Sequence, residues 1–273
     1  MLGLADQARR GIGGGEEAGG MLRVAATSVV AEHGGEALID AFAARSPGLE
    51  VTLEEKPGSS FAELLEQRRV DVALGPRPSE AAGAQAKAVP CLRCRIVIVA
   101  APGHRLSGAR DLPASALAGE RWLVGPGGTD TATAEGRFLE RHLASVPTEA
   151  VQAYGNEGAA LAAARSGEGI MLAVSHAVRE QVRRRALIVL DLAEMPLVDI
   201  WHASTLPEDR CLPAARALQR FAATPEGMQA IFGGRGWVPA ARFRPPVHVT
   251  LWRSVADVAT PAGEAGDEPA TRR

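Results

Sequence analysis

The sequence predicts an α/β protein with two Rossmann-like lobes joined by two crossover strands. Residues 22–75 and 121–175 each alternate apolar strands with amphipathic helices in the order β-α-β-α-β, which builds a parallel sheet covered by helices. Two further apolar segments, 94–102 and 197–205, carry the chain from the first lobe to the second and back. Two crossings favour a hinge between the lobes over two independent domains.

Apolar periodicity places the elements of the first lobe. We expect strand, helix, strand, helix and strand, in that order, at 22–26, 34–48, 49–55, 57–69 and 70–75. In the first helix Leu38, Ile39 and Phe42 share one face, as in a helix that packs on a sheet. In the second helix Ser59 or Ser60 is expected as the N-cap, with a glutamate three residues later closing a capping box.

The second lobe repeats the same pattern. The expected strand, helix, strand, helix and strand occupy 121–125, 133–143, 150–155, 156–169 and 170–175. A glycine-rich turn precedes the first of these helices, so Thr129, Asp130 or Thr131 is its expected cap. Asn156 is the expected cap of the second helix.

The chain then returns to the first lobe. We expect a helix at 176–185, a strand at 186–192, the return strand at 197–205, and helices at 213–224 and 224–232. The last helix has Thr224 as cap and proline at its first position. Alternating apolar residues predict a further half-buried strand at 247–252, and the small, polar, proline-rich end predicts disorder.

Composition excludes several classes of protein. A chain of 273 residues with 46% hydrophobic residues can bury a sizeable core. No run of eighteen apolar residues and no signal-peptide pattern occurs, so we expect a cytoplasmic protein without a membrane partner. The formal net charge of -2 gives no overall basic field for nucleic acid.

Three cysteines, Cys91, Cys94 and Cys211, do not form an even disulfide framework. "PCLRC" has the spacing of a metal or redox pair, but it lies in a strand-like stretch, where residues three apart point to opposite faces. No second CxxC or His pair completes a zinc site. We therefore expect ordinary thiols, no bound metal and no cofactor.

Residues 22–222 resemble the effector-binding domain of LysR-type transcriptional regulators. The resemblance is carried by "ALIDAFAARSPGLEVTLEE", "FAELLEQRRVDVALGP" and "IVIVAAPGHRLSGARDLPASALAGERWLV", in this order. Two departures occur. His104-Arg105-Leu106 replaces the family's His-Pro-Leu step, and the first helix is approached through "AEHGGEAL" in place of a proline-bearing turn beside the expected pocket.

The resemblance implies the fold of type 2 periplasmic binding proteins, with a ligand cleft between two lobes. We expect the chain to divide into a remnant of a linker helix and flexible joint (1–21), the first part of lobe I (22–90), lobe II (91–198), the return strand and helices on lobe I (199–232), a C-terminal extension with a strand (233–253) and a disordered tail (254–273). The family's DNA-binding winged helix-turn-helix is not expected within this chain, and a homodimer or higher homo-oligomer is.

Eight residues form the expected ligand site. Seven follow strand ends, because ligands of two-lobed α/β proteins bind where strand ends and helix N-termini converge, and the eighth, His202, is a weaker candidate on the return strand near the hinge. They are Thr27, Ser28, Ser59, Ser60, Gly128, Thr129, Asn156 and His202. Hydroxyls, free amides and positive helix ends favour an anionic effector. Each residue could equally be a helix cap or, for His202, a structural histidine.

The sequence leaves more than one function open. "GPGGT" lacks the GK[ST] ending of a phosphate loop, and no HExxH or GxSxG motif occurs. The leading hypothesis is a ligand-sensing domain of a LysR-type regulator. The alternatives are a transporter's solute-binding protein and, less favoured, an enzyme on the same scaffold.

Overall fold

The computed structural model describes residues 20–79, 85–143 and 150–233, which all lie in one compact unit. The expected linker remnant lies almost wholly outside these residues, and the expected strand at 247–252 and the tail lie entirely outside them. Within the described ranges, no helix has the length and apolar character needed to cross a membrane.

The helices and strands occur in the expected order. The first lobe contains β1 (Met21–Ala26), α2 (Ser28–Val30), η1 (Ala31–Gly35), α3 (Glu36–Ala43), β2 (Glu50–Glu55), η2 (Gly58–Ser60), α4 (Phe61–Glu66) and β3 (Val72–Gly75). The second lobe contains η4 (Ala114–Leu117), β5 (Trp122–Val124), α5 (Ala134–Leu143), β6 (Val151–Ala153), α6 (Glu157–Ser166), β7 (Met171–Val174), α7 (Ser175–Arg183) and β8 (Ile188–Val189). After the return strand come η6 (Glu208–Arg210), α8 (Pro213–Ala222) and α9 (Pro225–Gly233).

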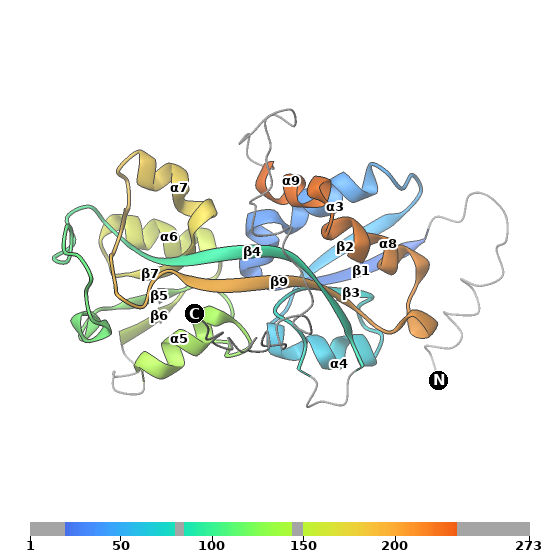
Figure 1. Cartoon of the computed structure of the whole chain (residues 1–273), viewed down its shortest axis with the longest axis horizontal. Helices are drawn as coiled ribbons and strands as arrows, with labels where there is room; N and C mark the ends of the chain where they lie inside the picture. The colour runs from blue at the N-terminus through green and yellow to red at the C-terminus, as the bar shows by residue number, and fades with distance from the viewer. Residues whose placement is uncertain (1–19, 80–84, 144–149, 234–273) are drawn as a thin grey trace, which may run out of the picture. The chain divides into compact units, whose positions relative to one another are not determined.

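Two long strands, β4 (Lys87–Ala100) and β9 (Leu197–Thr205), run side by side through both lobes (Figure 1). The main sheet has the order β2-β1-β3-β9-β4-β7, with β8 also paired to β4, and β5 pairs with β6. The pairs of β1 with β2 and β3 are parallel, whereas β9 is antiparallel to β3 and β4. The predicted fold class, two α/β lobes joined by two crossover strands, is confirmed.

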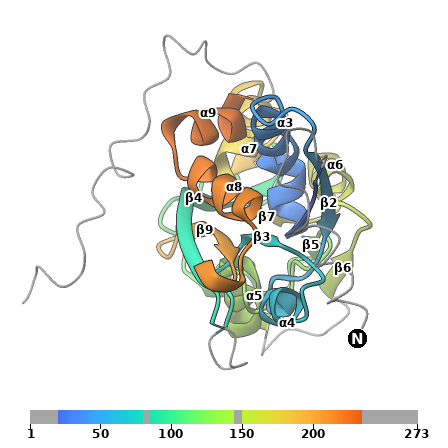
Figure 2. The same cartoon turned by 90° about the vertical axis from the view of Figure 1, so that its right-hand side faces the viewer.

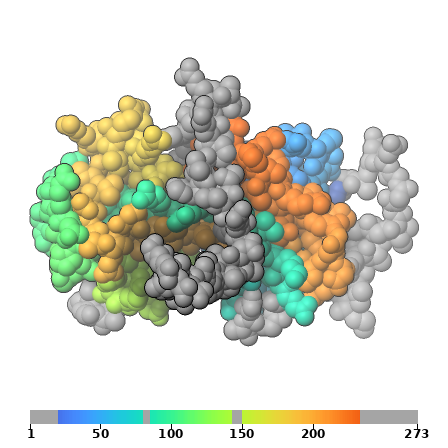
Figure 3. All heavy atoms as spheres, viewed as in Figure 1, coloured from blue at the N-terminus to red at the C-terminus, as the bar shows by residue number. Residues whose placement is uncertain are grey.

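Strand alternation divides the core of each lobe between two sheet faces. On β1, Leu22, Val24 and Ala26 belong to one buried cluster and Ala25 to another, as a period of two requires. Helices α3, α8 and α9 cover the first face and α4 the second (Figure 2). Atoms of β4 and β9 reach the surface on the face seen in Figure 3.

Several helix predictions hold in detail. Leu38, Ile39 and Phe42 are the buried residues of α3. The Asn156 side chain accepts a hydrogen bond from the amide of Ala159 and caps α6. Thr224 Oγ1 likewise accepts from the amide of Gly227 at the start of α9. These caps follow from local sequence because their partners lie three residues away.

Two predicted caps are wrong. Ser60 is at the N-cap of α4, but its hydroxyl donates backward to the carbonyl of Pro57 at 2.7 Å and caps nothing. At α5 the cap-like bond runs from the amide of Gly136 to Thr133 Oγ1, so Thr129, Asp130 and Thr131 do not have this role. The helix begins at Ala134, within one residue of the expected start, and the residue directly before it, Thr133, accepts the cap-like bond in place of the three residues further upstream.

The expectation that the thiols of Cys91 and Cys94 diverge is also wrong. The β4 ladder is irregular between Pro90 and Leu92, and this bulge shifts the alternation by one residue. Both cysteines are therefore buried in the same cluster, with Sγ atoms 3.2 Å and 3.7 Å from the carbonyl oxygens of Trp201 and Asp199. Burial raises the pKa of Cys91 to about 12, so its thiol stays protonated at neutral pH.

Gln219 ties α8 to both crossover strands. Its buried side-chain amide donates to the carbonyl of Lys87 on β4 at 2.6 Å and to that of Ala203 on β9 at 3.0 Å. Replacing it with leucine leaves the buried carbonyl of Ala203 and the part-buried carbonyl of Lys87 without this donor, at a cost of about 1–3 kcal/mol. In urea unfolding we expect Gln219→Leu to lower the free energy of unfolding by that amount. Arg220→Leu, at an exposed neighbouring position, is the control, and equal midpoints for the two variants would contradict the assignment.

Candidate functional site

A cavity of about 310 Å³ lies between the two lobes. Lobe I contributes the segments that follow β1, β2 and β3, and lobe II contributes the segment after β5 together with the starts of α5 and α6. The floor includes residues of β7 and β9. Parallel strands direct their carboxyl ends to one edge of a sheet, which is where ligands of α/β proteins bind. The cavity is thus a product of the strand order.

The loop after β5 must approach lobe I and α6 closely. At Gly125 a Cβ atom would collide with the carboxyl of Glu157, and Gly127 has a φ of 72°, a conformation that favours glycine. The glycine-rich turn that suggested a phosphate loop therefore has a steric reason. It lets the backbone pass between β5 and the start of α6.

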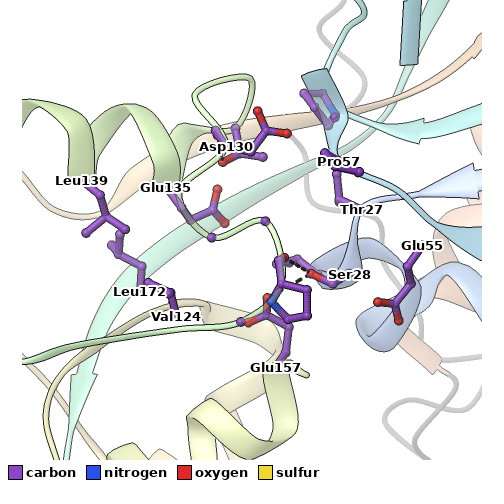
Figure 4. A pocket seen from close by; sticks show the side chains of 18 of the residues that line it. Thr27, Ser28, Glu55, Pro57, Val124, Asp130, Glu135, Leu139, Glu157 and Leu172 are labelled. Atoms are coloured by element: carbon purple, nitrogen blue, oxygen red, sulfur yellow. Dashed lines mark hydrogen bonds between the residues drawn. The ribbon is translucent and has the colours of Figure 1, made fainter. Parts of the chain in front are cut away.

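Ser28 connects the lobes through its hydroxyl. Its Oγ lies 2.6 Å from the carbonyl oxygen of Pro126 and 3.1 Å from Glu157 Oε1 (Figure 4). A carbonyl oxygen only accepts, and a serine has one hydroxyl proton, which serves the shorter contact. An ionised Glu157 carboxylate therefore competes with Pro126 for this hydroxyl proton, whereas a protonated Glu157 carboxyl can itself donate to Ser28 Oγ.

Two more contacts cross between the lobes. The amide of Ser59 donates to Asp130 Oδ2 at 3.0 Å. The Glu32 carboxylate accepts from the amides of Glu157 and Gly158, at 2.7 Å and 3.1 Å, at the N-terminus of α6. Free amides and the helix dipole make such an end an anion site, and here a carboxylate of the chain itself occupies it.

Carboxyl groups dominate the charge of the cavity wall. Burial, the nearby charge of Asp199 and, to a smaller extent, that of Glu157 raise the pKa of Glu135 to about 7, against smaller opposing effects of its own amide and Arg137. Burial, with the charges of Glu32 and Glu55, raises the pKa of Glu157 to about 7 as well, against the lowering effect of the hydrogen bond with Ser28. Burial also raises the pKa of Asp199. Both glutamates are therefore partly protonated near neutral pH.

The structure brings three of the eight expected site residues to the cavity wall: Thr27, Ser28 and Gly128. The other five do not line it. Thr129 and Ser59 are exposed, although the backbone of Ser59 takes part in the contact with Asp130. Ser60 bonds to Pro57, Asn156 caps α6, and His202 lies on β9 away from the wall.

Sequence reasoning did not identify the acidic wall. Glu135 and Glu157 occupy the first turns of α5 and α6. Acidic residues are common there because they stabilise the helix dipole, so they do not by themselves indicate a ligand site. Asp199 lies on the return strand β9, far along the chain from both glutamates. The one available signal was "AEHGGEAL", the departure from the family pattern, since it contains Glu32. Within the described ranges no three His, Cys, Asp or Glu side chains gather as a metal site requires.

The raised pKa values of Glu135 and Glu157 predict a pH dependence of stability. Their unfolded-state pKa is near 4.5, so between about pH 5 and pH 7 the unfolded chain loses protons that the folded chain keeps. The contribution of these groups to stability is therefore lost as pH rises, by up to about 3 kcal/mol for each. We expect Glu157→Gln to flatten the fall in unfolding free energy over this range.

Glu140→Gln, an exposed position on α5, is the matched control and should keep the wild-type pH profile. The measurement is urea unfolding at a series of pH values. If Glu157→Gln and the wild type show the same slope, the Glu157 carboxyl does not titrate as described.

Comparisons with known proteins agree with this architecture. Residues 15–224 match the family model described as the LysR substrate binding domain. The HTH-type transcriptional regulator MT0391 of Mycobacterium tuberculosis (strain CDC 1551 / Oshkosh), named as uncharacterized, is 33% identical over 234 residues, covering 85% of this chain and 72% of that protein. The HTH-type transcriptional regulator CfxR of Cupriavidus necator is 27% identical over 184 residues, covering 67% and 57%.

Among solved structures, the regulatory domain of CcmR from Synechocystis PCC6803, in complex with 2-PG, has a similar fold. Its TM-score is 0.61 at 22% identity, over 75% of this chain and 96% of that one. The family match spans both lobes and the crossover strands, the same elements that enclose the cavity. The chain therefore belongs to the LysR substrate-binding domain family.

Proposed function

We propose that this domain senses a small-molecule effector, which binds in the cavity between the lobes and thereby controls transcription. The observation that carries the proposal is the cavity of about 310 Å³, a volume suited to a small metabolite, with walls from both lobes. The regulatory domain of CcmR, similar in fold, was solved with 2-PG, which supports small-molecule binding as the role of this architecture.

The contacts that cross the cavity give the effector a way to act. Ser28, Ser59 and Glu32 each link lobe I to lobe II beside the cavity. A molecule that binds both walls adds to these links, and one that displaces a link weakens them. Either way it shifts the equilibrium between arrangements of the lobes by the difference in its affinity for them.

The change in lobe arrangement alters DNA binding by a helix-turn-helix of the kind that the names of the relatives indicate. We place the protein in the cytoplasm, acting as a homodimer, and assign the cavity no catalytic role. A transporter's solute-binding protein, the second hypothesis from sequence, has no specific observation in its favour.

A thermal-shift screen of small metabolites tests the cavity as the effector site. A compound that raises the melting temperature should also change tryptophan fluorescence, because Trp122 and Trp201 line the cavity. We expect Ser28→Ala to alter its affinity by roughly 5- to 150-fold, since the change removes a hydroxyl worth about 1–3 kcal/mol from the wall.

Ser59→Ala is the matched control for Ser28→Ala. Ser59 lies beside the cavity without lining it, and it contacts Asp130 through its backbone amide, which alanine retains. Affinity within about twofold of wild type is expected, because no side-chain hydrogen bond is lost. A hit that binds all three proteins equally and leaves the fluorescence unchanged would place binding outside the cavity.

The homodimer is tested separately by sedimentation velocity over a range of protein concentrations. We expect the fraction of dimer to rise with concentration and to reach a majority in the high micromolar range, as mass action requires for a specific weak pair. A single monomeric species throughout that range would contradict the proposed assembly.

A further inference from the structure

The charge of the cavity is one-sided. Five carboxyl groups line it, and they belong to Glu55, Asp130, Glu135, Glu157 and Asp199. One lysine, Lys56, also lies on the wall, but its Nζ pairs with Glu54 Oε2 at 3.1 Å. The guanidinium of Arg137 donates to the backbone carbonyls of residues 131 and 132. Among the residues that the structure describes, the wall therefore offers acceptors in excess and no uncommitted cation.

Two of the places where an anionic group would bind are filled by carboxylates of the chain. Glu32 holds the first two amides of α6, and Asp130 accepts from the amides of Ser59 and Ala132. Amides at helix starts and turns were the reason to expect an anionic effector. With those donors engaged, the favourable electrostatic partner for the remaining carboxyl groups is a positive charge.

Glu135 is the group left without a partner. Its side chain is nine-tenths buried, and in the described part of the chain no other residue donates a hydrogen bond to it. Figure 4 shows its carboxyl pointing from α5 toward the loop of Thr27 and Ser28, across the cavity. A buried carboxyl that faces open space and a second carboxyl is costly unless a cation or a donor arrives.

Other charged groups face these carboxyls from every neighbouring element. Asp199 on β9, Glu157 on α6 and Arg137 on α5 act on Glu135, whose charge in turn acts on Cys94 of β4. Glu32 on η1 and Glu55 on β2 act on Glu157. Arg137 is the one cation in these two sets, so the net field at the cavity is negative.

Resting on the effector site proposed above, we propose that the effector is a small organic cation, with an ammonium or amidinium group bound between Glu135 and Asp199 and a short apolar body. Trp122, Leu139 and Leu172 line the same cavity and supply the apolar surface for that body. The ammonium group donates hydrogen bonds to carboxylates that otherwise repel each other. Binding thus removes a repulsion that the ligand-free lobes retain.

Matched pairs of amines and carboxylates test this proposal on the whole chain. The probes are n-butylammonium against butanoate, benzylammonium against benzoate, and 1,4-diaminobutane against butanedioate, followed by thermal shift and calorimetry. We expect the amines to raise the melting temperature and the carboxylates not to. Between about pH 6 and pH 8 the affinity of the best amine should rise about tenfold, because carboxyls with a pKa of about 7 ionise over this range.

Glu135→Gln separates binding from a structural role. It should weaken the best amine at least tenfold and remove most of the pH dependence, while raising the ligand-free melting temperature at about pH 8, where the wild type holds two like charges. Asp199→Asn should weaken the same amine. Glu140→Gln on the exposed face of α5 is the control and should match wild type.

The outcomes distinguish this proposal from the effector site itself. The cationic effector is overturned if carboxylates bind, if their affinity falls from about pH 6 to pH 8, and if Glu135→Gln binds them more tightly. That result leaves the proposed effector site intact. Amines that bind Glu135→Gln and Asp199→Asn as tightly as wild type also overturn the cationic effector. If neither series binds, but Ser28→Ala changes the affinity of a metabolite from the screen, the proposal of a cationic effector is wrong and the proposed effector site stands. If no compound of any class binds, both proposals fail.

Discussion

The antiparallel ladder between β4 and β9 is the constraint on which the rest of the structure depends. Its register runs from Lys87 opposite Thr205 to Ile96 opposite Leu197, so one pair of strands belongs to both lobes. β3 joins this pair in lobe I and β7 joins it in lobe II. Because the lobes share two strands, they can change their relative position only by bending or twisting that ladder, and the cavity lies where such a movement acts.

The chain fills two of its own anion sites and leaves carboxyl groups facing the cavity. Glu32 at the start of α6 stabilises the contact between lobes, since a carboxylate there meets both free amides and the positive end of the helix dipole. In the described part of the chain, Glu135 has no comparable arrangement, and the nearby charge of Asp199 disfavours its ionised form. Unfavourable charge retained in a buried cavity is common at functional sites, where a ligand supplies the missing partner.

Much of the fold could be predicted because its signals are local. The apolar periodicity of α3, the cap at Asn156 and the alternation along β1 all depend on residues within a few positions of each other. The failures have a different origin. Ser60 turned back to Pro57 in place of capping α4, and the irregularity in β4 placed both cysteines in one cluster. Each depends on a backbone path that neighbouring residues alone do not specify.

The sequence by itself determined the two-lobed α/β fold, the order of its elements and the position of the cavity at the strand ends. Tertiary structure decided what the cavity contains. Glu32 and Glu157 are 125 residues apart, and Ser28 and Glu157 are 129 apart. A glutamate in the first turn of a helix can face solvent, another helix end or a second carboxyl. Which of these it faces depends on the loops that the β4–β9 ladder brings together. The charge of the site is therefore a property of the packed lobes, because Coulomb interactions depend on distance in space and not along the chain.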